Sequence, residues 1–264
     1  MQHPIKNIAG YQFITIEDIT SMRLQVQNIC DQTHLKGTIF ISPEGINLSL
    51  AGNGTDIDFA IEQLNSECGF KQLLFNTTYA AVIPFRRLLV KAREELVPTG
   101  SALDQADKDD QNYITSEMLK QWLDEGKDFT LLDLRNSYEF ELGSFDGAQH
   151  LQLKYFRDLE NACSKLNSVP TNKPIVTFCT GGIRCEKGAA YIAQHGFDQV
   201  HQLKGGILDY LQKFRHHHWH GDCFVFDERV SLDHELNPTY AKLCRSCQTA
   251  LQSIEERFCS ACVS

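Results

Sequence analysis

One stretch of the chain combines the residue types that make a cysteine reactive, Cys179-Thr-Gly-Gly-Ile-Arg184-Cys185-Glu186-Lys187. It follows the apolar run Pro174-Ile-Val-Thr-Phe178 and precedes Gly188-Ala-Ala-Tyr-Ile-Ala193, which predicts a buried strand, a glycine-bearing turn and a helix. That order places the Cys179 sulfur at a helix N-terminus, where backbone N–H groups and the helix dipole favour an anion. A thiolate held there has a lowered pKa and acts as a nucleophile.

The predicted active-site loop that follows Cys179 consists of Thr180, Gly181, Gly182, Ile183 and Arg184. The two glycines let the backbone bend without Cβ clashes, and the arginine adds a fixed positive charge. Four residues separate the cysteine from the arginine, one fewer than in cysteine phosphatases, and this shorter ring suits a sulfur-sized group better than a phosphate. The simpler interpretation is a buried cysteine before an ordinary strand-to-helix turn, but it leaves the glycines and the arginine without a reason.

Four nearby residues have two interpretations each. Cys185 lies six residues after Cys179 and is either a second reactive thiol, which makes the pair redox-capable, or a helix-start cysteine that faces the core. Asp133 and Arg135 either orient the loop through charge-assisted hydrogen bonds or form a structural pair at a strand end. For Lys187 we expect a solvated side chain rather than a charge that lowers the thiolate pKa.

Two cysteine pairs near the end of the sequence have the spacing of a zinc site: Cys244 with Cys247, and Cys259 with Cys262. Each C-x-x-C turn directs two thiolates toward one ion, so the pairs predict a structural tetrahedral zinc, with a redox-active tail as the alternative. The run His216-His-His-Trp-His220 does not predict a metal site, because adjacent histidines on a helix do not face one point.

The composition is that of a globular protein of about two domains. The chain has 264 residues, of which 42% are hydrophobic and 22% charged. No apolar run approaches the ~18 residues of a membrane span, and the N-terminus lacks a signal-peptide pattern, so we expect a cytoplasmic protein without a membrane partner. The 10 cysteines are then thiols or metal ligands rather than a disulfide framework. The sequence does not specify the oligomeric state.

The elements that must position these residues fall into four segments. Residues 1–95 show the order β-α-β-β-α-β of a ferredoxin-like domain. Residues 96–111 form a polar linker, residues 112–217 alternate strand and helix as a parallel α/β domain does, and residues 218–264 form a cysteine-containing extension.

The expected boundaries follow from hydrophobic periodicity and capping residues. In the first segment we expect strands at 11–16, 37–41, 45–50, 73–79 and 87–92, and helices at 19–30 and 56–64. In the third segment we expect strands at 129–134, 175–178 and 200–203, and helices at 117–126, at 186–195 and from the glycine pair 205–206 to 214.

A basic stripe stands out against the net charge of −9, which argues against a nucleic-acid binder that uses its whole surface. Arg87, Lys91 and Arg93 alternate along one face of a predicted strand, with Arg86 beside them. The stripe is either a plain solvent face of an edge strand or a surface that contacts RNA phosphates, with binding that weakens as salt rises. We expect no DNA partner.

Several motifs of the middle segment are those of a known fold. Asp133-Leu-Arg135 with Glu139 matches the D-x-R-x-x-x-E signature of rhodanese domains, and Gly147-Ala-Gln-His150 and Gly205-Gly206 match two further elements of that family. The segment therefore resembles a rhodanese domain. In rhodaneses the position of Cys179 carries a persulfide, which makes Cys179 the expected catalytic residue.

The resemblance extends over the chain from about residue 10. Ser42-Pro-Glu-Gly-Ile-Asn47, the loop 179–187 and Gly221-Asp-Cys-Phe-Val-Phe-Asp227 match one subgroup, the rhodanese-related tRNA uridine hydroxylases. Members of that family add a hydroxyl to carbon 5 of the wobble uridine in an oxygen-dependent reaction. The resemblance implies the same reaction here, with tRNA as partner and molecular oxygen as co-substrate. The sequence carries no flavin, haem or nicotinamide motif, so no further catalytic cofactor is expected.

Two other functions use the same features. A sulfurtransferase would use the Cys179 loop to move sulfane sulfur from thiosulfate or a protein persulfide to an acceptor thiol. A non-enzymatic rhodanese-fold module would use the first domain to hold RNA or protein, although the retained Cys179 and Arg184 argue against it.

Overall fold

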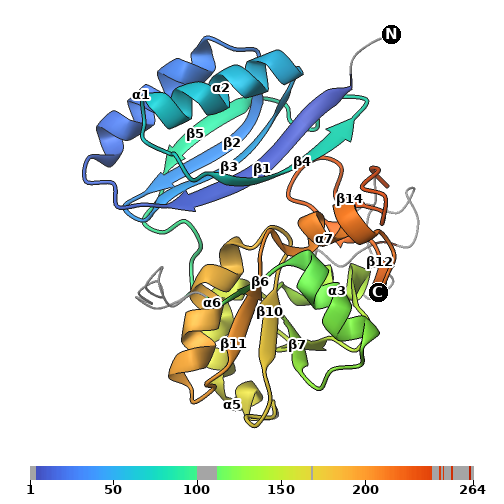
Figure 1. Cartoon of the computed structure of the whole chain (residues 1–264). Helices are drawn as coiled ribbons and strands as arrows, with labels where there is room; N and C mark the ends of the chain where they lie inside the picture. The colour runs from blue at the N-terminus through green and yellow to red at the C-terminus, as the bar shows by residue number, and fades with distance from the viewer. Residues whose placement is uncertain are drawn as a thin grey trace. The chain divides into compact units, whose positions relative to one another are not determined.

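The computed structural model describes residues 4–99, 112–167, 169–239, 244, 246, 251 and 262. The chain divides into two compact units, Met1–Leu96 and Val97–Ser264, each with its own sheet and core (Figure 1).

The first unit contains five strands and two helices among the described residues. In chain order they are β1 (Ile5–Phe13), α1 (Ile19–Asp31), β2 (Lys36–Ser42), β3 (Gly45–Gly52), α2 (Gly54–Ser66), β4 (Leu74–Ala80) and β5 (Leu88–Ala92). The strand order in the sheet is β4-β1-β3-β2-β5, with β5 parallel to β2 and the other pairs antiparallel. The first four strands give the predicted ferredoxin-like arrangement, and β5 extends it as an edge strand.

Both helices of the first unit lie on one face of its sheet (Figure 1). Alternate strand residues such as Ile39, Leu48 and Val90 point to that face and form a core with Val26 and Leu64 of the helices. The helix starts follow from the sequence, because Asp18 and Asn53 cap α1 and α2 by accepting backbone N–H bonds. The odd-numbered residues of β5 point to the opposite face of the sheet.

One strand of this unit begins earlier than predicted. We expected the first strand at 11–16, whereas β1 runs from Ile5 to Phe13. Gly10 lies inside this strand, where it allows close packing. A Cβ at Gly10 would lie 2.5 Å from the Leu74 carbonyl oxygen and from the Phe75 Cβ. The glycine therefore belongs inside the strand, where it lets β4 approach.

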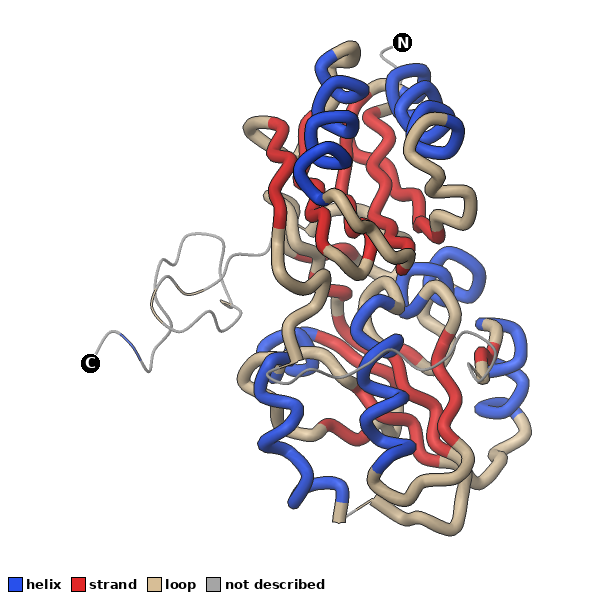
Figure 2. The backbone as a smooth tube through the Cα atoms, turned by 90° about the vertical axis from the view of Figure 1, so that its left-hand side faces the viewer, coloured by secondary structure: helices blue, strands red, loops and turns tan. Residues whose placement is uncertain are grey.

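The second unit has a central parallel sheet with helices on both sides (Figures 1 and 2). Its first elements are β6 (Tyr113–Ile114), α3 (Ser116–Asp124), β7 (Thr130–Asp133), α4 (Ser137–Leu142), β8 (Gly143–Phe145), β9 (Gln149–His150), a 3-10 helix (Phe156–Ala162) and α5 (Cys163–Leu166). The remaining elements are β10 (Ile175–Phe178), α6 (Ile183–Gln194), β11 (Val200–Leu203), α7 (Gly206–Phe214), β12 (Trp219–Gly221), β13 (Cys223–Phe224) and β14 (Ser231–Leu232).

The strand order of the main sheet is β6-β11-β10-β7-β9, and all four pairings are parallel. The predicted parallel α/β class is therefore confirmed. β10 is the central strand and all its residues are buried. In such sheets ligands bind outside the carboxyl ends of the strands, so the residue after β10, Cys179, occupies a position suited to a functional group.

The helix after the Cys179 loop begins three residues earlier than the expected 186–195. Gly182 adopts a left-handed conformation with φ of +100° and is the N-cap, so Ile183, Arg184 and Cys185 already belong to α6. The positive charge of Arg184 and the thiol of Cys185 are thus carried by the first helical turn rather than by the loop.

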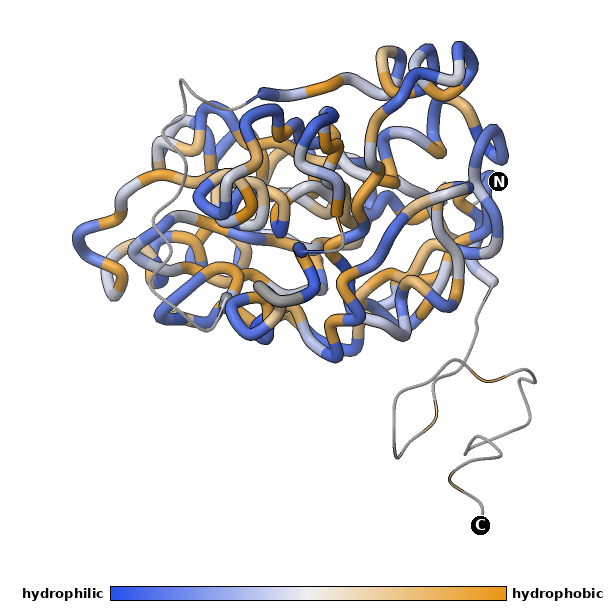
Figure 3. Tube along the Cα trace, turned by 90° about the horizontal axis from the view of Figure 1, so that it is seen from below, coloured by the Kyte–Doolittle hydropathy of each residue, from blue (hydrophilic) through white to orange (hydrophobic). Residues whose placement is uncertain are grey.

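Apolar and hydrophilic residues alternate over short distances along the chain (Figure 3). Among the described residues, no helix combines the length and the apolar character needed to cross a membrane.

Candidate active site

The Cys179 side chain lies directly after β10 and is fully buried. The backbone N–H of Gly182 donates a hydrogen bond to the Cys179 Sγ at 3.2 Å. This bond bends the loop back over the sulfur, and the N-terminus of α6 follows immediately. The geometry is that of an anion site at a helix start, as the sequence pattern predicts. Because Cys179 has no exposed surface, a large substrate reaches its sulfur only after the surrounding groups move.

The charge on Cys179 depends on opposing effects. Burial alone would raise the pKa of its thiol above the ordinary value of 9.0. A hydrogen bond from the Cys185 side chain, the positive charge of Arg184, and the backbone N–H groups of Arg184 and Gly182 outweigh burial and lower the pKa to about 6. Cys179 is therefore a thiolate at neutral pH.

Cys185 is buried in the first turn of α6 and interacts directly with Cys179. Burial, together with the hydrogen bond to Cys179, raises the pKa of Cys185 well above its ordinary value. The two sulfurs therefore share one negative charge, with Cys179 as the anion and Cys185 as the donor. Cys185 thus faces the core, as one of its two interpretations states, and also contacts the reactive sulfur. Its role as a redox partner of Cys179 stays a prediction.

This arrangement predicts the pH dependence of Cys179 reactivity. Labelling by iodoacetamide requires the thiolate, so its rate should be maximal at neutral pH and should fall as the pH drops through about 6. Cys185→Ala removes the strongest of the interactions that favour the thiolate, and should shift this midpoint to higher pH. Peptide mass spectrometry at a series of pH values measures both.

The same samples contain an internal control. Burial raises the pKa of Cys30 to about 12, so Cys30 should remain unlabelled throughout this pH range. A midpoint near 9 for wild-type Cys179, or an unchanged midpoint in Cys185→Ala, would contradict the shared-charge arrangement.

Arg184 is held by a buried carboxylate that sequence analysis did not assign to the site. Its Nη1 donates to Glu139 Oε2 at 2.6 Å, and its Nη2 donates to Glu139 Oε1 at 2.8 Å. Glu139 also accepts the Asn136 backbone N–H at 3.0 Å, which closes the capping box of α4. The signal in the sequence for this role was the place of Glu139 as the final residue of the D-x-R-x-x-x-E signature. One carboxylate therefore fixes the guanidinium and starts a helix.

Asp133 and Arg135 form the structural pair that was one of their two interpretations. Both side chains are fully buried, and Arg135 Nε and Nη2 donate to the Asp133 carboxylate at 2.6–3.0 Å. Arg135 also donates to the Gly143 carbonyl at 2.6 Å, and the Ser144 hydroxyl donates to Asp133 at 3.0 Å. These bonds attach β8 to the end of β7. They do not bind the residues 179–184, so we describe the pair as supporting the sheet edge.

The N-terminus of α7 holds the other side of the Cys179 loop. The N–H groups of Ile207 and Leu208 donate to the carbonyl oxygens of Cys179 and Thr180 at 3.0 and 3.1 Å. Gly206 makes this approach feasible, since a Cβ there would lie 2.4 Å from the Cys179 carbonyl oxygen. Its φ of +66° is also a conformation that favours glycine. The Gly205-Gly206 element thus shapes the active-site loop from outside it.

We expect Gly206→Ala to destabilise the protein by about 2–3 kcal/mol, because it combines a steric clash with backbone strain. Activity should fall by more than the loss of folded protein accounts for, since the clash displaces the Cys179 backbone. Gly196→Ala is a matched control. Its φ is +89°, but a Cβ there would meet no atom within 4 Å. Gly196→Ala therefore introduces backbone strain without a steric clash. Urea unfolding of both variants measures the difference, and equal losses would contradict the clash.

Comparisons with known proteins identify both units. Residues 5–96 match the family model of the UPF0176 acylphosphatase-like domain, and residues 115–213 match the rhodanese-like domain. The tRNA uridine(34) hydroxylase of Cupriavidus metallidurans is 36% identical over 258 residues, 96% of this chain and 92% of that protein. The chain belongs to the tRNA uridine(34) hydroxylase family. The resemblance inferred from the sequence motifs is therefore confirmed.

Other members of the tRNA uridine(34) hydroxylase family show similar values. The protein from Bordetella parapertussis is 37% identical over 234 residues, 89% of this chain and 98% of that protein. Among solved structures, a rhodanese-like domain from Anabaena sp. aligns with 42% of this chain and 80% of its own, with 21% identity and a TM-score of 0.36.

The burial of the Lys187 side chain differs from the sequence prediction. We expected a solvated side chain, but Lys187 is buried. Because α6 begins at Ile183, Lys187 lies inside the helix rather than in its first turn, in a stretch from Arg184 to Gly188 that is buried throughout.

The predicted zinc site lies partly outside the described residues, since Cys247 and Cys259 are not among them. Cys244 is buried and Cys262 is partly exposed. Within the described part of the chain, no group of three or more His, Cys, Asp or Glu side chains could hold a metal. The zinc site therefore remains a prediction from spacing. In the histidine run, His218 and His220 instead contact single carboxylates, Asp124 and Asp146.

The basic stripe follows β5, an edge strand of the first unit. Lys91 lies within the strand, and Arg87 and Arg93 flank its two ends. Val90 points into the core, so Lys91 points to the opposite face, and Lys91, Arg86, Arg87 and Arg93 are all exposed. The Arg93 guanidinium lies 5.0 Å from the centre of the partly buried Phe40 ring on the neighbouring strand β2. The stripe thus joins cations to an aromatic side chain on the face without helices.

Proposed function

We propose that this chain hydroxylates carbon 5 of uridine 34, the wobble uridine, in tRNA. The observation that carries the proposal is the similarity to tRNA uridine(34) hydroxylases over 96% of the chain. That similarity spans the first unit as well as the rhodanese-like domain, whereas a sulfurtransferase would require only the second. Because tRNA is the substrate, we place the reaction in the cytoplasm.

The chemistry replaces a C–H bond of the base by C–OH. We infer that molecular oxygen is the co-substrate, so that one oxygen atom enters uracil. The other oxygen atom leaves as water with two electrons and two protons from an external dithiol, which is oxidised to its disulfide. The residues on the protein side are the Cys179 thiolate and its fixed cation Arg184. A thiolate adds to electron-poor carbons such as uracil carbon 6, which moves the electron pair of the C5–C6 double bond to carbon 5. We expect Cys179 to activate the base in this way and to leave carbon 6 again when the hydroxylated carbon 5 loses its proton.

The proposal is tested by nucleoside mass spectrometry of total tRNA. Cells that lack the gene should lose 5-hydroxyuridine and its derivatives, and only wild-type protein should restore them under air. Persistence of the nucleoside, together with turnover of thiosulfate and cyanide by the purified protein, would favour the sulfurtransferase. Loss of the nucleoside that is restored equally by an inactive Cys179 variant would favour a binding module.

We further propose that the face of β5 with the basic stripe binds the tRNA backbone. Three exposed cations along one edge strand can each neutralise a phosphate, and the local positive field can attract RNA despite the net charge of −9. Phe40 beside Arg93 adds an aromatic surface to the stripe.

Replacing Arg87, Lys91 and Arg93 together by Gln should weaken tRNA binding and should lower the slope of log K against log salt by about 2. Filter binding at several salt concentrations measures the slope. A control variant replaces Lys6, Arg23 and Lys71 by Gln, which changes the net charge equally outside β5. The same slope in both variants would exclude the stripe as the binding surface.

A further inference from the structure

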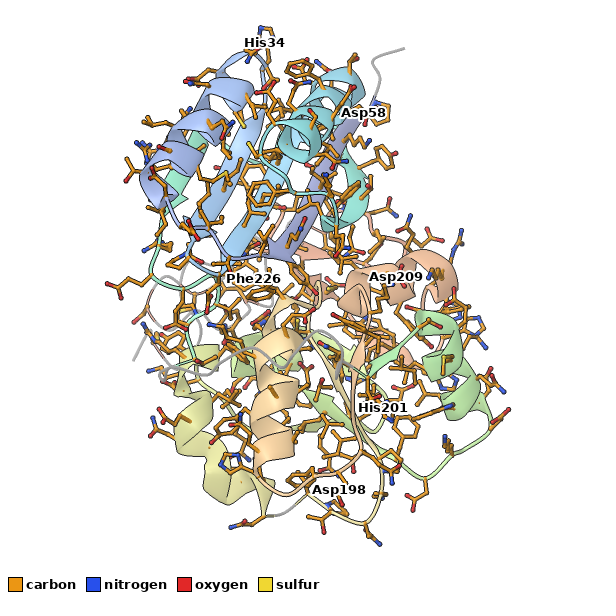
Figure 4. The ribbon with its side chains drawn as sticks, turned by 60° about the vertical axis from the view of Figure 1, so that its left-hand side comes forward. His34, Asp58, Asp198, His201, Asp209 and Phe226 are labelled. Atoms are coloured by element: carbon orange, nitrogen blue, oxygen red, sulfur yellow. The ribbon has the colours of Figure 1, made fainter. Side chains whose placement is uncertain are left out.

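Phe226 is a large apolar side chain that remains 62% exposed beside the active-site loop. It belongs to the second unit and is labelled in Figure 4. The Arg184 guanidinium carbon lies 5.7 Å from the centre of its ring. Burial of a phenylalanine stabilises a protein by roughly 1.5–3 kcal/mol, and a ring that is 62% exposed gains only part of this stabilisation.

The ring is held in place by its own segment. The Val225 N–H donates to the Val230 carbonyl at 2.9 Å, and the Val230 N–H donates to the Asp227 carbonyl at 3.0 Å. The guanidinium of Arg229, which is itself buried, donates through Nε and Nη2 to the Asp227 carboxylate at 2.8 and 2.5 Å. This tight turn fixes the backbone on both sides of Phe226.

Two further aromatic rings support Phe226 from behind. Phe224 meets it edge to face at 5.0 Å between ring centres, and Tyr138 of α4 meets Phe224 in the same way at 5.1 Å. The three rings therefore form a packed series in which only Phe226 is widely exposed.

The aromatic series is attached to the loop that carries Cys179. The Thr180 hydroxyl lies 3.5 Å from the Phe224 carbonyl oxygen, and Arg184 Nη2 lies 3.3 Å from the same hydroxyl. Arg184 in turn is fixed by Glu139, the neighbour of Tyr138 in α4. The position of the exposed ring is thus coupled to the position of the reactive loop.

Basic residues lie on the segment next to this series. The Asn136 side chain donates to the Tyr138 hydroxyl and accepts the Phe156 N–H at 2.8 Å. Just before Phe156, Tyr155 is exposed, with Lys154 and Arg157 at 5.6 and 4.7 Å from its ring centre. Aromatic rings interleaved with cations suit a single-stranded nucleic acid, whose bases stack while its phosphates pair with the cations.

We propose that Phe226 is the stacking platform for the nucleobase at position 34, which it holds over Arg184 at the entrance to the Cys179 loop. This inference rests on the proposed function for the identity of the base. A planar, uncharged uracil can stack on the exposed ring face, while Arg184 contributes a cation at its edge. Phe226 is a positioning residue, since it holds the base and takes no part in bond making.

The first experiment is photocrosslinking, which does not depend on hydroxylation. The full chain is mixed with an anticodon stem-loop RNA that carries 5-bromouridine at position 34, irradiated, and digested for peptide mass spectrometry. We expect the crosslink on Phe226. A crosslink confined to other residues, or none at all, would overturn the platform whether or not the chain is a hydroxylase.

The second experiment separates substrate positioning from folding. Phe226→Ala should raise KM for tRNA by about 10- to 100-fold, with little change in kcat or in thermal midpoint. Phe226→Trp should retain activity, because it keeps the stacking surface. Met118→Ala, which truncates another exposed apolar side chain of the same unit, should behave as wild type.

The outcomes distinguish the two proposals. If Phe226→Ala hydroxylates tRNA at the wild-type rate and with an unchanged KM, the proposal for Phe226 is overturned and the proposed function stands. No hydroxylation by wild type, with a crosslink still on Phe226, would remove the function and leave a base-binding platform. A lowered thermal midpoint in Phe226→Ala with an unaltered KM would assign the ring to folding instead, and would also overturn the platform.

Discussion

Cys179→Ser should abolish formation of 5-hydroxyuridine, with a rate loss of ~10³-fold or more. A serine hydroxyl does not ionise near neutral pH, so the anion that the Gly182 N–H and Arg184 stabilise would be absent. The fold should persist, because the oxygen can accept the same Gly182 N–H in nearly the same volume. Liquid chromatography with mass spectrometry of tRNA nucleosides measures the product, and circular dichroism measures the fold.

Cys68→Ser is the matched control for this experiment. Cys68 is also a buried, free cysteine, but burial raises its pKa to about 11, so it carries no thiolate at neutral pH and its replacement should leave the rate unchanged. Residual hydroxylation above a tenth of wild type in Cys179→Ser would show that the thiolate is dispensable. Loss of soluble protein would instead assign Cys179 a structural role.

Glu139→Gln should cost about 3–5 kcal/mol of stability, because it leaves the buried guanidinium of Arg184 without its counter-charge. The neutral amide also weakens the cap of α4, since it reaches the Asn136 N–H without a charge. Activity should fall as well, because Arg184 loses the contact that fixes it beside Cys179. Urea unfolding followed by near-ultraviolet circular dichroism measures the stability change.

Two further variants make the reason for this loss testable. Glu141→Gln removes the same charge from an exposed position two residues along α4 and should change stability by less than about 0.5 kcal/mol. In Glu139→Gln/Arg184→Met no buried charge is left unpaired, so part of the stability should return while activity stays low. A double variant that is less stable than Glu139→Gln alone would contradict the buried-charge explanation.

Local features of the fold were predictable where a few adjacent residues determine them. The start of α1 follows from the cap at Asp18, and the strand–loop–helix pattern places Cys179 at a helix N-terminus. The start of β1 was not predictable, because the reason for Gly10 lies in the approach of β4, which is distant in sequence.

The site shows the same division. The loop chemistry of Cys179 and Arg184 could be inferred from spacing, because both belong to one turn. The role of Glu139 could not, since it lies 45 residues from Arg184 and the two meet only when α4 packs beside the loop. The hydrogen bond between Cys185 and Cys179 likewise depended on where α6 begins, which Gly182 decides through its left-handed backbone.

The low pKa of Cys179 exists only in the folded chain, because the groups that lower it meet only there. In an unfolded chain the thiol has its ordinary pKa of 9.0 and is mostly protonated in the cell, so it reacts slowly with oxidants and electrophiles. The depressed pKa stabilises the folded state, fully above pH 9 and progressively less as the pH falls through about 6. A nascent chain on the ribosome therefore carries an unreactive thiol, and the sulfur becomes a nucleophile only when Arg184, Gly182 and Cys185 have assembled around it.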